Sequence, residues 1–143
     1  MKITAVDVYI KSKWSKGQGM AAGIMVCYTN AGEKKKLVKV ESNEESRTKM
    51  LLELMVEVLS MLRYACTVAF YVEDMMIRNA IENKWWMMWE DNNWKKSSGQ
   101  DVVNKDTWEK LAPLLKTHDV GICKYINTHD KELNDAIKNA KEN

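Results

Sequence analysis

The sequence predicts an α/β domain in which a mixed sheet of about five strands is covered by helices on both faces. Three observations support this. The first 42 residues contain three strand-like segments joined by short turns. The rest of the chain alternates helical patterns with short apolar strands. The 143 residues are 45% hydrophobic, which is enough for the core of one domain of ordinary size.

The N-terminal strands are predicted by period-2 alternation and by turn residues. Residues 2–11 alternate apolar and polar side chains, and residues 20–28 are mostly apolar, as in a strand covered on both faces. Residues 29–34 have the composition of a hairpin turn. The lysine-rich segment 35–42 is typical of an edge strand. Together they predict three antiparallel strands.

Helical periodicity then alternates with apolar strands, which favours two parallel crossovers. The first helix is expected to be capped by Ser42, with Glu45 completing a capping box, or by Ser46. Pro113 is expected to bend or shorten a later helix. The expected elements are a helix over 46–64, a strand over 66–72, a helix over 74–89, a loop over 90–101, a helix over 104–119, a strand over 120–126 and a helix over 130–143.

Composition excludes several classes of protein. The 22 basic and 20 acidic residues give a net charge of +2, which by itself does not indicate a nucleic-acid partner. No apolar run is long enough to span a membrane, and the N-terminus lacks a signal-peptide core. We therefore expect a soluble cytoplasmic protein. Cys27, Cys66 and Cys123 are widely spaced in apolar surroundings, which favours buried thiols over a metal or redox site.

Two segments resemble the ribonuclease H family. "FYVEDMMIRNAIENKWWMMWEDNNWKK" is similar to the family's strand, acidic residue and Trp-rich helix pair. "DVVNKDTWEKL" is similar to its V-x-N-x-D-x-W segment, with Asn104, Asp106 and Trp108 in register. The resemblance implies a single ribonuclease H-like domain over residues 1–143. It also implies an enzyme that cleaves the RNA strand of RNA–DNA hybrids with two magnesium ions held by four carboxylates.

The resemblance assigns each of three of the four carboxylate positions to one residue. The first, an aspartate on the first strand, is Lys11 here. The second, a glutamate on the first long helix, is Leu51 here. The third, at the end of the fourth strand, is Glu73. The resemblance therefore identifies a divergent member with an incomplete carboxylate set.

The fourth position lies on the final helix. The resemblance assigns it to Asp135, with a one-residue uncertainty that would substitute Asn134. The family's mobile histidine matches His129. The catalytic positions that the chain retains are thus Glu73, Asp135 and His129, and Glu73 and Asp135 would hold a metal ion weakly or not at all.

Replacing an aspartate by a lysine changes the local charge by two units. At about 4 Å and an effective dielectric constant of about 20, each pair of unit charges interacts by roughly 4 kcal/mol. Lys11 would therefore repel a divalent cation, and Leu51 offers it no ligand atom. Glu53 does not rescue the site, because shifting the helix by two residues turns it by about 200°. Asp7 lies roughly 13 Å before Lys11 along an extended strand, which is too far to share its metal.

The Trp-rich segment has two interpretations. We expect Trp85, Trp89 and Trp94 to pack the helices together, because Trp85 and Trp89 are i, i+4 partners. We expect Trp86 to lie on the surface and contact nucleic acid. Three lysines match the region with which the family holds the DNA backbone: Lys84, Lys95 and Lys96.

These observations predict a catalytically inactive, ribonuclease H-like module that binds RNA–DNA hybrid or duplex nucleic acid and needs no cofactor. One alternative is a divergent ribonuclease H that uses Glu73 and Asp135 with magnesium or manganese. Another is a protein-interaction module. We expect no membrane association, and a protein partner remains compatible with each interpretation.

Overall fold

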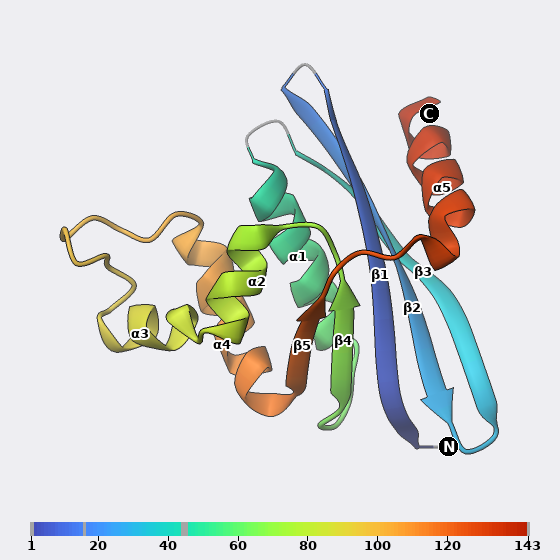
Figure 1. Cartoon of the computed structure of the whole chain (residues 1–143), viewed down its shortest axis with the longest axis horizontal. Coiled ribbons are helices and arrows are strands. Elements are labelled where there is room, and N and C mark those ends of the chain that lie inside the picture. The colour runs from blue at the N-terminus through green and yellow to red at the C-terminus, as the bar shows by residue number, and fades with distance from the viewer. Residues whose placement is uncertain (1, 16, 44–45, 143) are drawn as a thin grey trace.

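The expected five-stranded mixed sheet is present. The computed structural model describes residues 2–15, 17–43 and 46–142, and its strands follow the order β3-β2-β1-β4-β5 (Figure 1). The first three strands pair antiparallel, whereas β4 pairs parallel with β1, and β5 pairs parallel with β4. The predicted fold class is confirmed, and β1 is the central strand.

The strands match the predicted segments with different ends. Their bounds are β1 Ile3–Ser15, β2 Gln18–Thr29, β3 Gly32–Asn43, β4 Thr67–Tyr71 and β5 Asp119–Cys123. β1 continues past Lys11, which pairs with Ala22 of β2. The lysine therefore lies within the central strand rather than at its end. β5 is shorter than the predicted strand over 120–126.

The helices differ from the expected set in one respect. Their bounds are α1 Arg47–Ser60, α2 Met75–Glu82, α3 Trp85–Asp91, α4 Lys105–Thr117 and α5 Asp130–Glu142, with a short 3-10 helix, η1, at Asn127–His129. The single helix predicted over 74–89 is wrong, because the chain turns at Lys84, whose φ is 55°. That left-handed conformation is uncommon for a residue other than glycine and ends the regular helix.

Two expectations about helix ends are also resolved. Ser46 is the N-cap of α1, and its hydroxyl accepts the backbone N–H of Lys49 at 3.2 Å. Ser42 lies in β3, and Glu45 falls outside the described residues. Pro113 does not shorten α4, which continues to Thr117. The Thr117 hydroxyl donates to the Pro113 carbonyl at 2.9 Å.

The sheet separates two apolar layers of unequal size. The larger core lies between the sheet and α1, α2 and α4. The smaller core lies under α5, which covers the opposite face of the sheet (Figure 1). Its buried residues include Tyr9, Ile24, Leu133 and Ile137. Cys27 and Cys66 are buried free thiols, as expected, and Cys123 is half-buried. No helix of the described residues is long and apolar enough to cross a membrane.

The tryptophan packing agrees with the sequence-based expectation. Trp108 is completely buried, and the ring of Trp89 meets it edge-to-face with centroids 5.4 Å apart. Trp94 is buried in the same core, and Trp85 packs partly buried against it. These contacts attach α3 and α4 to each other and to the larger core.

Truncating Trp108 should therefore destabilise the whole fold. Because the side chain is 0% exposed, Trp108→Ala leaves a cavity and should lower the free energy of unfolding by about 3–5 kcal/mol. Urea denaturation followed by circular dichroism measures the loss. The control Leu37→Ala removes a side chain that is 49% exposed and should change stability by about 0.5 kcal/mol or less. Equal losses for both variants would contradict this packing.

Candidate functional site

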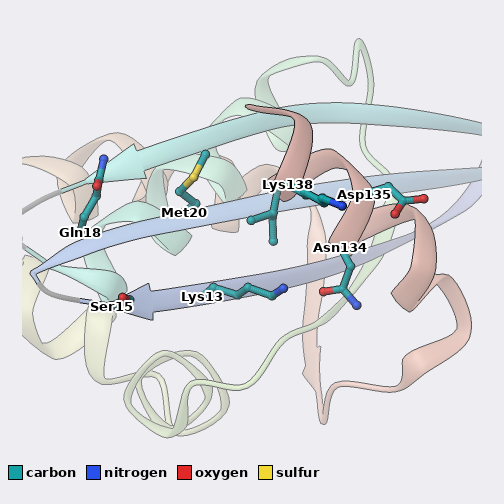
Figure 2. Close-up of a pocket in the computed structure, with 8 residues that line it drawn as sticks. Lys13, Ser15, Gln18, Met20, Asn134, Asp135 and Lys138 are labelled. Atoms are coloured by element: carbon teal, nitrogen blue, oxygen red, sulfur yellow. The ribbon is translucent and has the colours of Figure 1, made fainter. Parts of the chain in front are cut away.

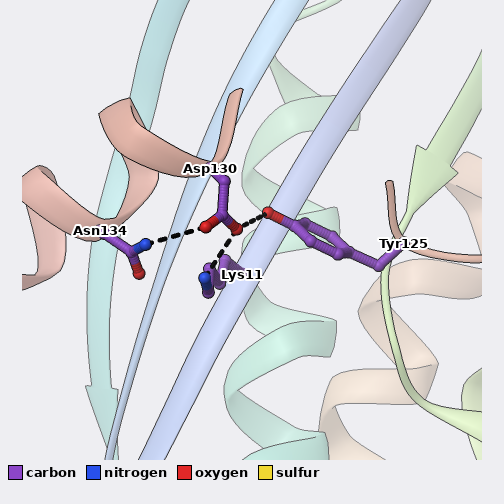
Figure 3. Close-up of polar contacts among 4 residues, drawn as sticks. All are labelled: Lys11, Tyr125, Asp130 and Asn134. Atoms are coloured by element: carbon purple, nitrogen blue, oxygen red, sulfur yellow. Dashed lines mark hydrogen bonds and ion pairs between the residues drawn. The ribbon is translucent and has the colours of Figure 1, made fainter. Parts of the chain in front are cut away.

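Lys11 points to the face of the sheet that α5 covers. It follows Tyr9 by two residues along β1, and Tyr9 belongs to the smaller core under α5. Its ammonium Nζ lies 2.6 Å from Oδ1 of Asp130, the first residue of α5 (Figure 3). The two side chains are 25% and 34% exposed, so the ion pair is partly buried.

Two further side chains hold the same carboxylate. The Tyr125 hydroxyl donates to Oδ1 of Asp130 at 2.6 Å. The Asn134 amide donates through Nδ2 to Oδ2 at 3.0 Å (Figure 3). We call Lys11, Tyr125, Asp130 and Asn134 the Lys11 cluster. Its one carboxylate accepts from a lysine, a phenol and an amide.

The Lys11 cluster perturbs the ionisation of two of its members. The hydrogen bond from Lys11, followed by that from Tyr125, lowers the pKa of Asp130 from its ordinary value of 3.8. Burial, and then the hydrogen bond to Asp130, raise the pKa of Tyr125 above its ordinary value of 10.0. At neutral pH the cluster therefore contains an ionised Asp130 carboxylate and a neutral Tyr125 phenol.

The structure distinguishes the two candidates for the fourth carboxylate position. Asn134 belongs to the Lys11 cluster, whereas Asp135 has a 58% exposed side chain and pairs with Lys131 at 3.3 Å. Figure 2 shows Asn134 directed toward β1 near Lys13, with Asp135 on another side of α5. Successive helix residues lie 100° apart, so only one of the two can face the cluster. An amide faces the cluster.

Within the described residues, the side chains at the other sequence-predicted positions form no hydrogen bond or ion pair with the Lys11 cluster. Leu51 is 0% exposed and belongs to the larger core. Glu73 is exposed just after β4, where it lines a cavity of about 640 Å³. His129 packs edge-to-face on Tyr9 with centroids 4.7 Å apart, and its Nδ1 lies 3.4 Å from Oε1 of Glu132.

Nearby acids are engaged elsewhere. Glu53 accepts a hydrogen bond from the Thr107 hydroxyl of α4 at 3.0 Å, so it points away from β1. Asp7 accepts a hydrogen bond from the Tyr28 hydroxyl at 3.0 Å, which raises the pKa of Tyr28 to about 12. Neither acid belongs to the Lys11 cluster.

This donor set does not fit a pair of divalent cations. Magnesium requires about six oxygen ligands in near-octahedral geometry. The carboxylate nearest Lys11 is already paired with it at 2.6 Å, and the Glu73 carboxylate lies outside the cluster. Over residues 2–15, 17–43 and 46–142, no three His, Cys, Asp or Glu side chains are grouped to hold a metal ion.

The segment expected to contact nucleic acid needs one correction. The expectation that Trp86 lies on the surface is wrong, because its side chain is 6% exposed and packs in the larger core. The turn at Lys84 rotates α3 relative to α2 and directs Trp86 inward. Lys84 and Lys96 are exposed, and Lys95 pairs with Asp101 at 2.8 Å.

Comparison with known proteins agrees with this fold. The RNase H family matches residues 6–141. A ribonuclease H of Clostridium botulinum is 40% identical over 114 residues, which cover 80% of this chain and 74% of that protein. This chain therefore belongs to the RNase H family.

Two solved structures share the fold. LC9-RNase H1, a type 1 RNase H with the type 2 active-site motif, has a TM-score of 0.72 at 18% sequence identity. The match covers 98% of this chain and 73% of the LC9-RNase H1 chain. A foamy viral protease–reverse transcriptase, solved in complex with an RNA/DNA hybrid, has a TM-score of 0.60 at 8% identity. That match covers 94% of this chain and 19% of the viral protein.

Sequence reasoning missed Asp130 as the partner of Lys11, and Tyr125 as a second donor to Asp130. One signal was available for Asp130, because it precedes Asn134 by four residues and so shares its helix face. Tyr125 carried no comparable signal, since it lies after β5 in a segment that was expected to be strand. Its approach depends on how the chain enters η1.

Removing the carboxylate of Asp130 should change how stability depends on pH. Because folding lowers the pKa of Asp130, its stabilising contribution is present above the ordinary value of 3.8 and is lost as pH falls through the lower folded value. Asp130→Asn should therefore have a lower free energy of unfolding than the native chain at neutral pH. The difference between the two free energies should become smaller below about pH 4. Urea titrations across this pH range measure the difference. The control Asp135→Asn should show a much smaller difference, because that carboxylate is exposed.

Proposed function

We propose that this RNase H family member binds RNA–DNA hybrid or duplex nucleic acid and does not cleave it. The observation that carries the proposal is the Lys11–Asp130 ion pair on the central strand. An ammonium is held where the family resemblance expects the first metal-binding carboxylate. Leu51 and Asn134 leave two further positions without a carboxylate.

Charge explains why this arrangement disfavours the two-metal mechanism. A divalent cation at this place would face Lys11 at short range, and each pair of unit charges costs roughly 4 kcal/mol at about 4 Å. It would also have to displace Lys11 from Asp130 before it could use that carboxylate. No hydrolytic step is therefore assigned to these residues.

Nucleic-acid binding is supported by the fold and by exposed cations. The viral neighbour with this fold was solved with an RNA/DNA hybrid. Lys84, Lys95 and Lys96 lie along α3 and the loop that follows it, which project away from the sheet (Figure 1). The proposal includes one domain over residues 1–143, of which the family match covers 6–141, and a cytoplasmic location, where the three free thiols would stay reduced.

The native chain should bind a hybrid without cutting it. We expect no cleavage of a labelled RNA–DNA hybrid with magnesium or manganese, while the Clostridium botulinum relative provides a positive control. Binding measured by fluorescence anisotropy should weaken steeply with salt, because each phosphate contact contributes a slope of about −0.9 to log K against log salt concentration. Robust metal-dependent cleavage would favour the divergent hydrolase. Absence of binding at low salt would favour the protein-interaction module.

Restoring carboxylates should create a metal requirement that the native chain lacks. Lys11→Asp combined with Asn134→Asp places two new carboxylates beside Asp130, so the variant should be destabilised in EDTA by like-charge repulsion. Manganese at about ten times its Kd should then raise the melting temperature of the variant by about 4 °C. Leu51 stays unchanged because a carboxylate there would be fully buried.

The matched controls are the native chain and Lys110→Asp, which repeats the charge change of the Lys11→Asp component on the exposed face of α4. Manganese should leave both melting temperatures unchanged. If manganese raised the melting temperature of the native chain, a cation would be binding at the Lys11 cluster despite the Lys11–Asp130 ion pair, contrary to the proposal.

A further inference from the structure

Arg47 bridges β1 and the segment that follows β4. It is the first residue of α1, and its Nε donates to the Ser12 hydroxyl of β1 at 3.0 Å. Its Nη2 donates to the backbone carbonyl of Glu73, which follows β4, at 2.7 Å. The guanidinium therefore lies where the end of β4 approaches β1, one residue along the strand from Lys11. A guanidinium has five N–H donors, so these two bonds leave others for a ligand.

Arg47 also lines the cavity of about 640 Å³ that contains Glu73. Arg78 of α2 and Lys124, which follows β5, line the same cavity. Within the described residues Lys124 forms no ion pair. The Nε of Arg78 donates to Oε1 of Glu82 at 3.2 Å, and both side chains are exposed. Three cationic side chains from separate elements thus converge on one opening.

Two carboxylates line the cavity as well, and they differ in their contacts. Asp74 accepts the backbone N–H of Ile77 and the Thr48 hydroxyl, both at 2.9 Å, so both of its oxygens are engaged. The Glu73 carboxylate forms no hydrogen bond or ion pair within the described part of the chain. The three cations and two carboxylates that line the cavity give it a net charge of +1. Because the Glu73 carboxylate has no hydrogen-bond donor of its own among the residues that the structure describes, its charge would repel a bound anion directly.

We propose that this cavity binds a phosphate of the nucleic-acid backbone directly through Arg47, Arg78 and Lys124, without a metal ion, and that Glu73 weakens this binding. The inference rests on the function proposed above and specifies how it is achieved. Arginine and lysine are suited to this role because they bind phosphate oxygens by charge-assisted hydrogen bonds.

The sign of the Glu73 effect separates this inference from a metal-dependent site. Where a carboxylate holds a cation that bridges to phosphate, removing its charge weakens binding. Where cationic side chains contact phosphate themselves, the same carboxylate repels the phosphate and competes for those side chains. The two arrangements therefore predict opposite results for one substitution.

The test measures anisotropy of a labelled RNA–DNA hybrid in EDTA and again in magnesium. Glu73→Gln should raise affinity about fivefold, by removing one like charge near the phosphate. Arg78→Gln combined with Lys124→Gln should lower affinity at least tenfold and make the salt slope shallower by about two. Both effects should be the same in EDTA and in magnesium. Arg47 is left intact because it also ties β1 to the segment after β4.

The controls are Glu109→Gln and Lys110→Gln, which make single charge changes on the exposed face of α4. Each should alter affinity less than twofold, and circular dichroism should confirm that all variants fold. Weaker binding by Glu73→Gln, or tighter binding only in magnesium, would overturn this inference. So would native-like binding by the Arg78 and Lys124 double variant, although that result would leave the function proposed above standing. No binding by the native chain at low salt would overturn both.

Discussion

The ion pair between Lys11 and Asp130 is the contact on which the arrangement of this site depends. A lysine on the central strand of a sheet, partly covered by a helix, requires a partner, because an unpaired charge there is poorly solvated. Asp130 supplies that partner from the first turn of α5, where a carboxylate is also favoured by the helix dipole. The same carboxylate orients Tyr125 and Asn134. One interaction thus fixes how α5 meets β1 and neutralises the charge of the site internally.

A second cation lies beside the neighbouring residue of the same strand. Successive side chains of a strand point to opposite faces, so Ser12 lies on the other face from Lys11 and meets Arg47 of α1 there. The central strand is therefore flanked by an ammonium on one face of the sheet and a guanidinium on the other. The two cations differ in availability. Lys11 is bound to a carboxylate, whereas among the described residues Arg47 donates to a hydroxyl and a carbonyl, and those two contacts do not neutralise its charge.

The sequence was most informative where local patterns decide the structure. Alternation and turn residues predicted the three antiparallel strands, and apolar periodicity predicted α1 and the crossovers. The break at Lys84 was missed because nothing in the local pattern requires a left-handed lysine, and the error placed Trp86 on the surface. The choice between Asn134 and Asp135 depends on the rotation of α5 against β1. Tertiary docking sets that rotation, and the sequence pattern left it open by one residue.

The replacements at the family's carboxylate positions are physically consistent with one another. A group of carboxylates without a cation repels itself and destabilises the fold. With Lys11 in place, an amide at Asn134 can donate to Asp130, which a second carboxylate could not do at neutral pH. Leu51, fully buried, contributes roughly 2 kcal/mol of apolar burial where a carboxylate would need a ligand. The Lys11 and Asn134 side chains support each other because both donate to Asp130, whereas Leu51 is stabilised separately by the larger core. Contacts within the protein therefore satisfy these three positions. The Glu73 carboxylate differs, because it forms no hydrogen bond or ion pair within the described residues.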